Sequence, residues 1–458
     1  MTPSLVELQS FSFRYAGARQ PVLRGISLQI RAGECHCLTG ATGSGKTTLA
    51  LALKGLLPSG VRSGRVQVPV EGRARRAGVG LVMQNPETQL FAGNIGEEVA
   101  FGLENLGFPA AEMEPRVRAA LRSVGLDRPL STPVAPLSMG EKYRLLLAAT
   151  LVLQPQVLIL DEPAAQLDAA GLKDLHDILA ALKVDGIAVL ICEHRPQPLH
   201  DLIDYFWRLD EAGQLQAGQQ DRAAAVDFAP SDVTVPALPI VPAITANDLA
   251  VRGGAEREIW SNASFRIWPG ERILVQGANG AGKSTLLHLL AGLQKPLNGE
   301  LAVLGRKPSL GGLRGRLGCL LQNPQKQLFE DTVAAEVGFA LQRKGVGRQE
   351  QKWKVDATLD ACGLRNLAGA SPHKLSFGQK HLVALAAVLA VGPELVLLDD
   401  PFAGLDHPSQ QRAWSLLLEQ NLQQGTTLVW TSHHVGATHP RPHAVLKVEG
   451  GSIVRQYA

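Results

Sequence analysis

Four short segments of the chain are almost continuously apolar. Val157–Leu160 and Leu395–Leu398 are the clearest, and Ile187–Ile191 and Thr427–Trp430 have the same character. Strands that are buried on both faces of a sheet carry continuous rather than alternating apolar residues. These segments therefore predict buried strands of a parallel sheet.

Two further strand-like segments, Glu34–Thr39 and Arg272–Gln276, end at glycine-rich loops. Each loop leads into a segment with helical periodicity, Thr47–Leu56 in one case and Ser284–Leu293 in the other. Strands that alternate with helices are typical of a parallel sheet covered by helices. The pattern therefore predicts an α/β fold.

The same series of motifs occurs twice along the chain. GATGSGKTT at Gly40–Thr48 returns as GANGAGKST at Gly277–Thr285, 237 residues later. QNPETQLF, LSMGEK and LILDEP return as QNPQKQLF, LSFGQK and VLLDDP, each 238 residues later. A spacing that four motifs share to within one residue predicts two copies of one domain.

A proline-rich segment, Ala223–Ala243, lies between the copies and contains Pro230, Pro236, Pro239 and Pro242. Proline is excluded from helix interiors and from central strands, so we expect an extended linker. The predicted domains are therefore residues 1–222 and 244–458, joined by a linker at 223–243.

Composition limits the classes of protein that the chain can be. Of its 458 residues, 45% are hydrophobic and 19% charged, which excludes a disordered protein. The 45 basic and 42 acidic residues give a net charge of +3, which argues against binding to a nucleic-acid backbone. Five arginines precede the first QNP motif without interleaved aromatic residues, so we interpret them as a solvated surface: Arg62, Arg65, Arg73, Arg75 and Arg76.

Cysteine usage and hydropathy point to a chain without a membrane span. The five cysteines are scattered without a CxxC pair, so we expect neither a disulfide framework nor a zinc site. The first residues do not have the pattern of a secretory signal. The longest apolar stretches, near Leu145–Leu153 and Leu382–Val391, fall short of the roughly 20 residues that cross a bilayer. Docking on a membrane protein stays open.

Both glycine-rich loops fit the pattern GxxxxGK[ST] between a strand and a helix. Backbone N–H groups of such a loop can bind phosphate oxygens, the lysine can bridge the β- and γ-phosphates, and the Thr or Ser hydroxyl can bind Mg²⁺. A glycine-rich turn with an incidental lysine is the alternative, and two copies in register argue against it. We predict nucleotide contacts from Gly40, Ala41, Thr42, Gly43, Ser44, Gly45, Lys46, Thr47 and Thr48, and from Gly277, Ala278, Asn279, Gly280, Ala281, Gly282, Lys283, Ser284 and Thr285.

Each copy carries a phosphate loop, a glutamine motif, an LSxG signature, an apolar strand that ends in aspartate, an (A/G)xLD loop and a terminal histidine, in that order. This order resembles the ABC-type ATPase domain over nearly the whole chain. The resemblance implies two P-loop ABC-type nucleotide-binding domains, each with a mixed, largely parallel sheet and a helical subdomain that carries the signature. It also implies ATP hydrolysis, with ATP and Mg²⁺ bound.

The resemblance assigns a role to each matching residue. Glu162 and Asp400 would act on the attacking water, and His194 and His433 would contact the γ-phosphate, although a solvated loop histidine is the alternative for each alone. Mg²⁺ would be held by Thr47, Gln84 and Asp161 and by Ser284, Gln322 and Asp399. The signature residues Ser138 and Gly140, and Ser376, Gly378 and Gln379, would contact ATP, although helix capping also explains these serines. Tyr15 would stack on adenine, and Asp168 and Asp406 match the loop that crosses to the opposite site.

ABC domains pair head to tail, so the resemblance predicts that ATP lies between the P-loop of one copy and the signature of the other, here within one chain. Site one, with the first P-loop and LSFGQ, matches the consensus. Site two, with the second P-loop and LSMGE, has the shorter Asp400 as its base and Glu141 in its signature, with Arg252 or Gly253 opposite Tyr15. We expect site one to hydrolyse ATP and site two to turn over slowly. The alternative is that Asp400 reaches the water through a small shift and both sites work.

The QNPxxQLF motifs, each followed by a VxFxL element, resemble the ATPase subunits of energy-coupling factor (ECF) importers for cobalt, nickel or vitamins. The implied partners are a transmembrane coupling (T) protein and a substrate-binding (S) membrane protein, which would place the chain at the cytoplasmic face of the membrane. Glu97, Glu98, Glu104 and Glu336 would line the grooves for coupling helices or form a solvated helix face. The rivals are a soluble twin-ABC ATPase of translation or repair and a tandem sugar-importer ATPase.

Overall fold

The structure is a computed structural model of the chain, and the chain divides into two compact units, Met1–Ala223 and Ala224–Ala458. Residues 219–240, most of the predicted linker, lie outside the described part, so the linker stays a prediction. The described residues are 4–41, 43–69, 78–167, 169–193, 196–218, 241–252, 258–278, 280–322, 324–402, 405, 407–432 and 440–457.

The first unit is built on a six-stranded sheet in the order β5-β6-β7-β3-β8-β9. The first five strands are parallel, and β9 is antiparallel to β8. All residues of β5, β6 and β7 are buried, as their continuous apolar sequences predict. The strands are β5 (Val79–Val82), β6 (Val157–Asp161), β7 (Ala188–Cys192), β3 (Cys35–Thr39), β8 (Tyr205–Leu209) and β9 (Leu215–Ala217).

A three-stranded antiparallel sheet, β2-β1-β4, forms a second part of this unit. Its strands are β1 (Ser4–Tyr15), β2 (Leu23–Arg31) and β4 (Gly60–Gln67). Burial alternates along β2, as expected for a sheet with one face on the core.

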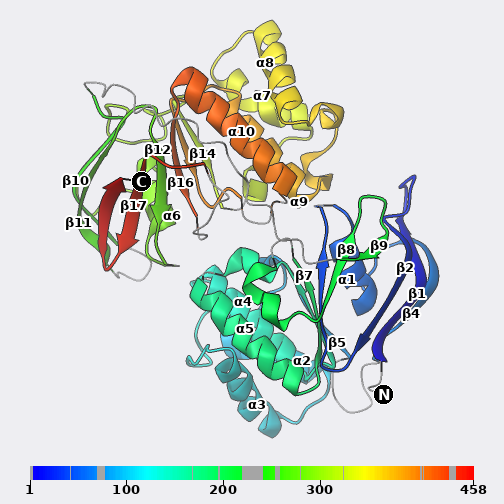
Figure 1. Ribbon diagram of the computed structural model, residues 1–458. Coiled ribbons are helices and arrows are strands. Elements are labelled where there is room, and N and C mark those ends of the chain that lie inside the picture. Colours follow the sequence, from blue (N-terminus) through cyan, green and yellow to red (C-terminus); the bar gives the residue numbers. More distant parts are fainter. Residues whose placement is uncertain are drawn as a thin grey trace. The chain divides into compact units, whose positions relative to one another are not determined.

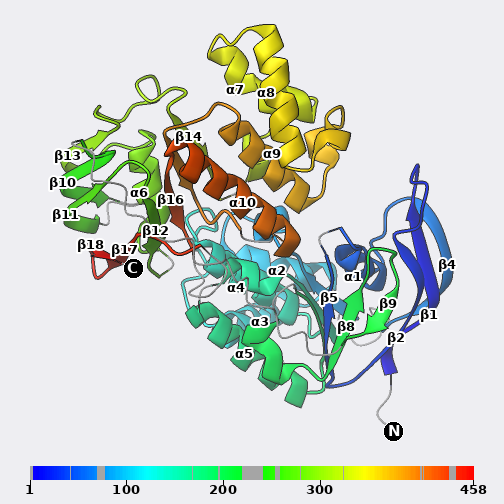
Figure 2. The ribbon, with the colours of Figure 1, turned by 45° about the horizontal axis from the view of Figure 1, so that its top comes forward.

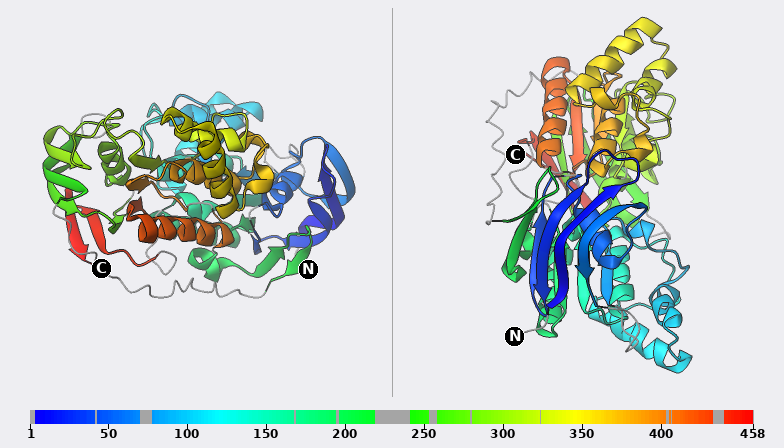
Figure 3. Two further views of the ribbon diagram at one scale, coloured as in Figure 1. Left: turned by 90° about the horizontal axis from the view of Figure 1, so that it is seen from above. Right: turned by 90° about the vertical axis from the view of Figure 1, so that its right-hand side faces the viewer.

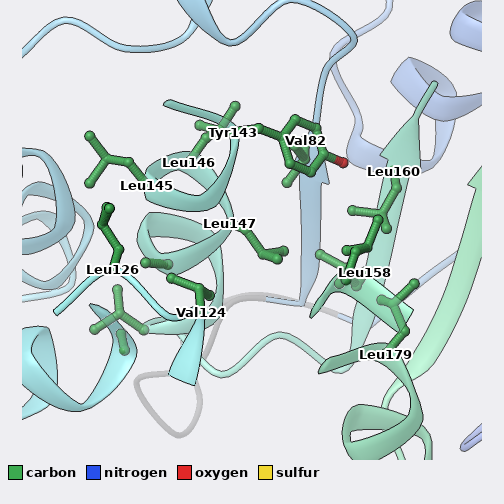
Figure 4. Close-up of a cluster of buried hydrophobic side chains, with 14 of the residues drawn as sticks. Val82, Val124, Leu126, Tyr143, Leu145, Leu146, Leu147, Leu158, Leu160 and Leu179 are labelled. Atoms are coloured by element: carbon green, nitrogen blue, oxygen red, sulfur yellow. The ribbon is translucent and has the colours of Figure 1, made fainter. Parts of the chain in front are cut away.

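In the described part of the first unit, five α-helices and three short 3₁₀ helices accompany the sheets (Figure 1). Tyr143 and Leu147 of α4 lie toward β5 and β6 in a buried cluster that includes Leu158 (Figure 4). The helices are α1 (Lys46–Lys54), α2 (Ile95–Asn105), α3 (Ala110–Ser123), α4 (Met139–Leu151) and α5 (Ala169–Val184), with η1 (Pro86–Thr88), η2 (Pro163–Gln166) and η3 (Gln197–Leu202).

The second unit repeats this topology strand for strand. Its larger sheet has the order β14-β15-β16-β12-β17-β18, and its smaller sheet has the order β11-β10-β13. The strands are β14 (Leu317–Leu320), β15 (Leu395–Leu398), β16 (Thr427–Thr431), β12 (Arg272–Gln276), β17 (Ala444–Glu449), β18 (Ser452–Tyr457), β10 (Ile244–Arg252), β11 (Glu258–Ile267) and β13 (Asn298–Val303). The predicted duplication and the predicted fold class are confirmed.

The helices of the second unit follow the same plan as those of the first. In each unit a pair of helices, α2 and α3 or α7 and α8, lies apart from the three-stranded sheet of that unit (Figures 2 and 3). The helices are α6 (Lys283–Leu290), α7 (Val333–Arg343), α8 (Arg348–Ala361), α9 (Phe377–Leu389) and α10 (His407–Gln424), with η5 (Pro324–Gln327), η6 (Arg365–Leu367) and η7 (Pro372–Lys374). None of the helices in the described ranges combines the length and apolar character that a bilayer crossing demands.

Two predicted helices are shorter than the periodicity indicated. The helix predicted to reach Leu56 ends at Lys54, because Gly55 adopts the left-handed conformation with φ 78°. The helix predicted to reach Leu293 ends at Leu290, just before Gly292 with φ 73°. Glycine stops these helices while the apolar pattern continues.

Candidate functional site

Both glycine-rich loops connect a central strand to the first residue of a helix. Gly45 and Gly282 precede α1 and α6 with φ values of 108° and 102°, which favour glycine. A Cβ atom on Gly40 would lie 2.4 Å from the carbonyl oxygen of Leu209, so a side chain is excluded there as well. The loops therefore keep their backbone close to the sheet and end at a helix N-terminus.

The two loop lysines make the same contacts. Lys46 Nζ donates to the carbonyls of Gly40 at 2.8 Å and Ala41 at 3.1 Å. Lys283 Nζ donates to the equivalent carbonyls of Gly277 at 2.7 Å and Ala278 at 2.9 Å. Both lysines are about 95% buried, at 5% and 6% exposure. Each loop thus combines a helix N-terminus with a buried ammonium group, which is a favourable place for a phosphate anion.

In the first unit the strand β6 delivers two carboxylates next to the phosphate loop. Thr47 Oγ1 donates to Asp161 Oδ2 at 2.8 Å, so a hydroxyl and a carboxylate lie side by side. Gln84 Nε2 donates to Glu162 Oε2 at 2.6 Å. Hydroxyl, carboxylate and amide oxygens are hard ligands, and this donor set fits Mg²⁺.

The second unit differs at the carboxylates because of Thr431, a residue that sequence reasoning did not single out. Thr431 Oγ1 donates to Asp399 Oδ1 at 2.8 Å and accepts from the backbone N–H of Asp400 at 2.7 Å. In the first unit Cys192 takes its place, and the Cys192 carbonyl accepts from Glu162 N at 2.8 Å. The second unit therefore anchors its aspartates through an additional hydroxyl group.

Burial and the neighbouring Asp399 raise the pKa of Asp400 to about 7, while Lys283 acts in the opposite direction. Glu162 and Asp400 also share an uncommon backbone conformation, with φ values of 51° and 45°. A left-handed conformation in a residue other than glycine costs free energy and is concentrated at functional sites. In both units, therefore, a carboxylate residue with a strained backbone follows the end of a strand.

Tyr15 ends β1 beside the first turn of α1. Its hydroxyl lies 2.9 Å from Thr48 Oγ1, and its ring packs edge-on against Phe13 with centroids 4.9 Å apart. An aromatic ring in this place can stack on a nucleobase whose phosphates occupy the adjoining loop.

Strand register decides which residue of the second unit corresponds to Tyr15. Phe13 is paired with Leu23 in the first unit, and Val251 is paired with Trp260 in the second. Two residues farther along, Tyr15 corresponds to Gly253 and not to Arg252. Gly253 lies outside the described residues, and the sequence from 253 to 257, GGAER, contains no aromatic residue.

The signature serines are helix N-caps, which confirms the capping interpretation. Ser138 Oγ accepts from Glu141 N at 3.3 Å at the start of α4, and Ser376 Oγ accepts from Gln379 N at 3.3 Å at the start of α9. Both helices have a full capping box. Contacts of Ser138, Gly140, Ser376, Gly378 and Gln379 to ATP stay predictions.

The sequence profile of the family described as ABC transporter matches residues 23–165 and 260–403. These two stretches contain both phosphate loops, both signatures and both pairs of carboxylates. The chain belongs to the ABC transporter family. It is a tandem ABC ATPase, and its two domains bind ATP.

Relatives of this ABC ATPase match over nearly its whole length. A protein of Methanosarcina acetivorans is 31% identical over 99% of this chain and 90% of its own. A protein of Vibrio parahaemolyticus is 30% identical over 98% of this chain and 87% of its own. Both are provisionally described as ABC transporter ATP-binding proteins.

One solved structure, cbiO1 from Clostridium perfringens, is described as part of the ABC transporter complex cbiONQ. It is 28% identical, covers 47% of this chain and 88% of its own, and superposes with a TM-score of 0.43.

Several predicted site residues of the ABC ATPase lie outside the described residues. These are Thr42 and Asn279 in the phosphate loops, Asp168 and Asp406, and the histidines His194 and His433. Their roles stay predictions. Gln322 lies two residues after the end of β14, as Gln84 does after β5.

The predicted role of Glu98 and Glu336 at a partner surface is wrong. Both are 4% exposed. Glu98 Oε2 accepts from Phe91 N at 3.0 Å and Ala92 N at 2.8 Å, and Glu336 Oε2 accepts from Phe329 N at 2.8 Å and Glu330 N at 2.8 Å. Each glutamate thus fixes the turn after QLF, because the backbone N–H groups there need an acceptor. Glu97 and Glu104 are exposed.

This turn presents an aromatic pair in each unit. Phe91 contacts Phe101 with ring centroids 4.5 Å apart, and Phe329 contacts Phe339 at 4.7 Å. Phe91 and Phe329 are 63% and 59% exposed. In the second unit Phe329 and Phe339 border a cavity of about 580 Å³, which is also lined by Arg343, Lys344, Ala384 and Val388.

Proposed function

We propose that this chain is the ATP-hydrolysing subunit of an ECF-type importer for a micronutrient, a vitamin or a transition-metal ion. The observation that carries the proposal is the repeated turn after QNPxxQLF, where an exposed phenylalanine packs against a second phenylalanine in both units. A contiguous exposed apolar patch is a mark of a protein-interaction site, and the two rings of each pair lie in contact. The turn lies seven residues after Gln84 and Gln322, and in the first unit the Gln84 side chain links this segment to the carboxylate of Glu162.

In this proposal Lys46 and Lys283 bind the β- and γ-phosphates, and the loop N–H groups bind the remaining phosphate oxygens. Thr47, Gln84 and Asp161 hold Mg²⁺ in one site, and Ser284, Gln322 and Asp399 hold it in the other. The metal neutralises phosphate charge when bound. Tyr15 orients adenine by stacking.

The two sites work at different rates in this proposal. Glu162 polarises the attacking water in site one, and the contact from Gln84 sets the direction of its carboxylate. Asp400 is one methylene shorter and is tied to Thr431 through its backbone, so it holds the water less well. The position of a general base is its first requirement, and a base contributes about 10²–10⁴-fold.

The partners in this proposal are a transmembrane coupling protein and a substrate-binding membrane protein. The domains pair head to tail within one chain, at the cytoplasmic face of the membrane. The exposed phenylalanines and the cavity beside Phe329 form the docking places for the coupling protein.

Purification of the tagged full-length chain from detergent-solubilised membranes of its own cells tests the proposal. We expect two membrane proteins to co-purify in fixed ratio, and ATP hydrolysis by the complex to drive uptake of a micronutrient in vesicles. Recovery of the chain with ribosomes or DNA-repair proteins, and none with membrane proteins, would support the soluble rival. Recovery with a sugar permease would support the second rival, a tandem sugar-importer ATPase.

A further inference from the structure

The signature helix of the first unit begins with an ion pair next to its N-cap. Glu141 Oε2 accepts from the backbone N–H and the hydroxyl of Ser138, both at 2.9 Å. Its other oxygen, Oε1, accepts a hydrogen bond from Arg128 Nη2. The Glu141 side chain is only 18% exposed, whereas that of Arg128 is 47% exposed. Arg128 therefore covers the carboxylate from the solvent side.

These contacts keep Glu141 ionised. Partial burial raises the pKa of the carboxyl, but the hydrogen bonds from Ser138 and the charge of Arg128 outweigh burial, so the pKa lies below its usual value. The N-terminus of α4 therefore carries a negative charge and, directly beside it, a positive one.

The second unit has neither charge. Gln379 takes the place of Glu141 in the same capping box, where its Oε1 accepts from Ser376 N at 3.1 Å. Asn366 takes the place of Arg128 in the sequence. The neighbouring Arg365 points to α8, where it pairs with Asp356 at 2.6 Å and Asp360 at 3.8 Å.

The two units thus differ by a pair of opposite charges at this place, and the charge of Arg144, which Leu382 replaces in the second unit, also lowers the pKa of Glu141. A carboxylate stabilises a helix N-terminus, but it also opposes the binding of another anion at that N-terminus. A neighbouring guanidinium group cancels most of this repulsion, since the fields of opposite charges a few ångströms apart largely offset each other.

We propose that Arg128 is a positioning residue that turns Glu141 to the side and offsets its charge, so that the signature of the first unit accepts ATP. This inference rests on the proposed function, in which that signature completes site two. The inference changes the interpretation of the LSMGE signature. The charge of Glu141 is offset by Arg128, so the slow ATP hydrolysis proposed for site two is due to Asp400 and not to Glu141.

The test uses full-length protein with Lys46→Ala, so that ATP binding reports site two, and equilibrium dialysis with radiolabelled ATP. We expect Arg128→Ala to raise the Kd by about threefold to tenfold, because Glu141 then repels the phosphates. Adding Glu141→Gln should restore the Kd, and Arg128→Lys should keep it. The loss should shrink in 0.5 M salt, because exposed charges are screened there.

A reciprocal pair in the second unit serves as matched control. In protein with Lys283→Ala, Gln379→Glu should raise the Kd of site one by a similar factor, and adding Asn366→Arg should bring it back.

Three results would overturn the inference: an unchanged Kd in Arg128→Ala, a loss that persists in the double variant with Glu141→Gln, or a loss that salt does not reduce. If ATP binding stays weak in the double variant, and Arg128→Ala and the double variant also melt at the same lowered temperature, Arg128 has only a structural role. Failure of the proposed function looks different: the parent proteins would bind ATP as before, but no membrane proteins would co-purify with the chain.

Discussion

Glu162 and Asp400 occupy equivalent places with the same strained backbone, yet the side chains differ by one methylene group. Their surroundings differ as well. Glu162 accepts from Gln84, whereas the backbone of Asp400 is fixed by Thr431. The same strained backbone holds a carboxylate at this place in both units. The different contacts of the two side chains are the reason why the two carboxylates need not activate water equally.

Neutralising these carboxylates should therefore have unequal effects. Glu162→Gln should lower the ATPase rate by about 10²-fold or more, since a general base contributes about 10²–10⁴-fold. Asp400→Asn should lower it by less than about threefold, because site two contributes little turnover. Steady-state phosphate release measures both, and equal losses in the two variants would mean that both sites hydrolyse ATP.

A buried histidine makes the stability of the second unit depend on pH. His381 in α9 is 1% exposed, and burial lowers its pKa to about 4, while the Pro401 carbonyl acts in the opposite direction. The unfolded chain binds this proton near pH 6.5, so stability falls as the pH falls from about 6.5 to 4 and is fully present above 6.5. The loss should approach about 3 kcal/mol at the acid end.

His381→Gln should remove this part of the acid sensitivity, because glutamine does not titrate. Chemical unfolding at pH 7 and pH 4.5 measures the difference. Loss of stability between these pH values that is the same in both proteins would assign the effect to other groups. The first unit has Tyr143 at this place, so its stability does not depend on pH through a buried histidine there.

At the scale of elements, several contacts join segments that are distant in the chain. The turn after each QLF motif is held by a glutamate from the next helix, and each phosphate loop packs on the end of a neighbouring strand. In the second unit Arg455 of β18 pairs with Glu271 before β12, with Nη2–Oε1 at 2.6 Å. Glu271 also accepts from Trp268 N at 2.7 Å.

Glu271→Ala should destabilise the second unit by about 3–5 kcal/mol, because it leaves Arg455 buried without its partner. The control is Glu34→Ala at the equivalent place of the first unit. Glu34 pairs with Arg31, which is 46% exposed, and also contacts His36 Nε2 at 3.1 Å, so the cost should be smaller than that of Glu271→Ala. Tryptophan fluorescence during urea unfolding reports the first unit through Trp207 and the second unit through Trp260, Trp268, Trp353, Trp414 and Trp430. Equal costs in both variants would contradict the prediction.

At the scale of the whole molecule, two units share one topology and one set of motifs but differ in chemistry. The first has Tyr15, Glu162 and the Arg128–Glu141 pair. The second has Thr431 beside two aspartates and a cavity behind its aromatic pair. Both units retain the exposed phenylalanines, which ATP chemistry does not require.

Replacing these phenylalanines should separate partner binding from hydrolysis. The double variant Phe91→Ser and Phe329→Ser should lose co-purification with membrane proteins, because both apolar contacts disappear. Its basal ATPase rate should stay within about twofold, since neither side chain contacts the phosphate loops. Trp353→Ser removes another side chain that is 68% exposed and should leave co-purification unchanged. Full recovery of the partners by the double variant would place the docking site elsewhere.

The sequence by itself determined the duplication, the order of buried strands and the phosphate loops. These features depend on local patterns: continuous apolar segments, a glycine spacing and a constant offset between motifs. The sequence also determined that Asp400 and Glu141 differ from the residues at the same positions of the other copy, because aligning the two copies reveals each substitution.

Only the tertiary structure decided what surrounds these residues. The sequence could not show that Glu98 and Glu336 are buried acceptors, because their partners are backbone N–H groups of a preceding turn. It could not show that Thr431 joins Asp399 and Asp400, or that Arg128 covers Glu141, because folding brings these groups together from separate segments. The sequence determines which residues are charged, but the tertiary structure determines which groups lie next to each charge and offset it.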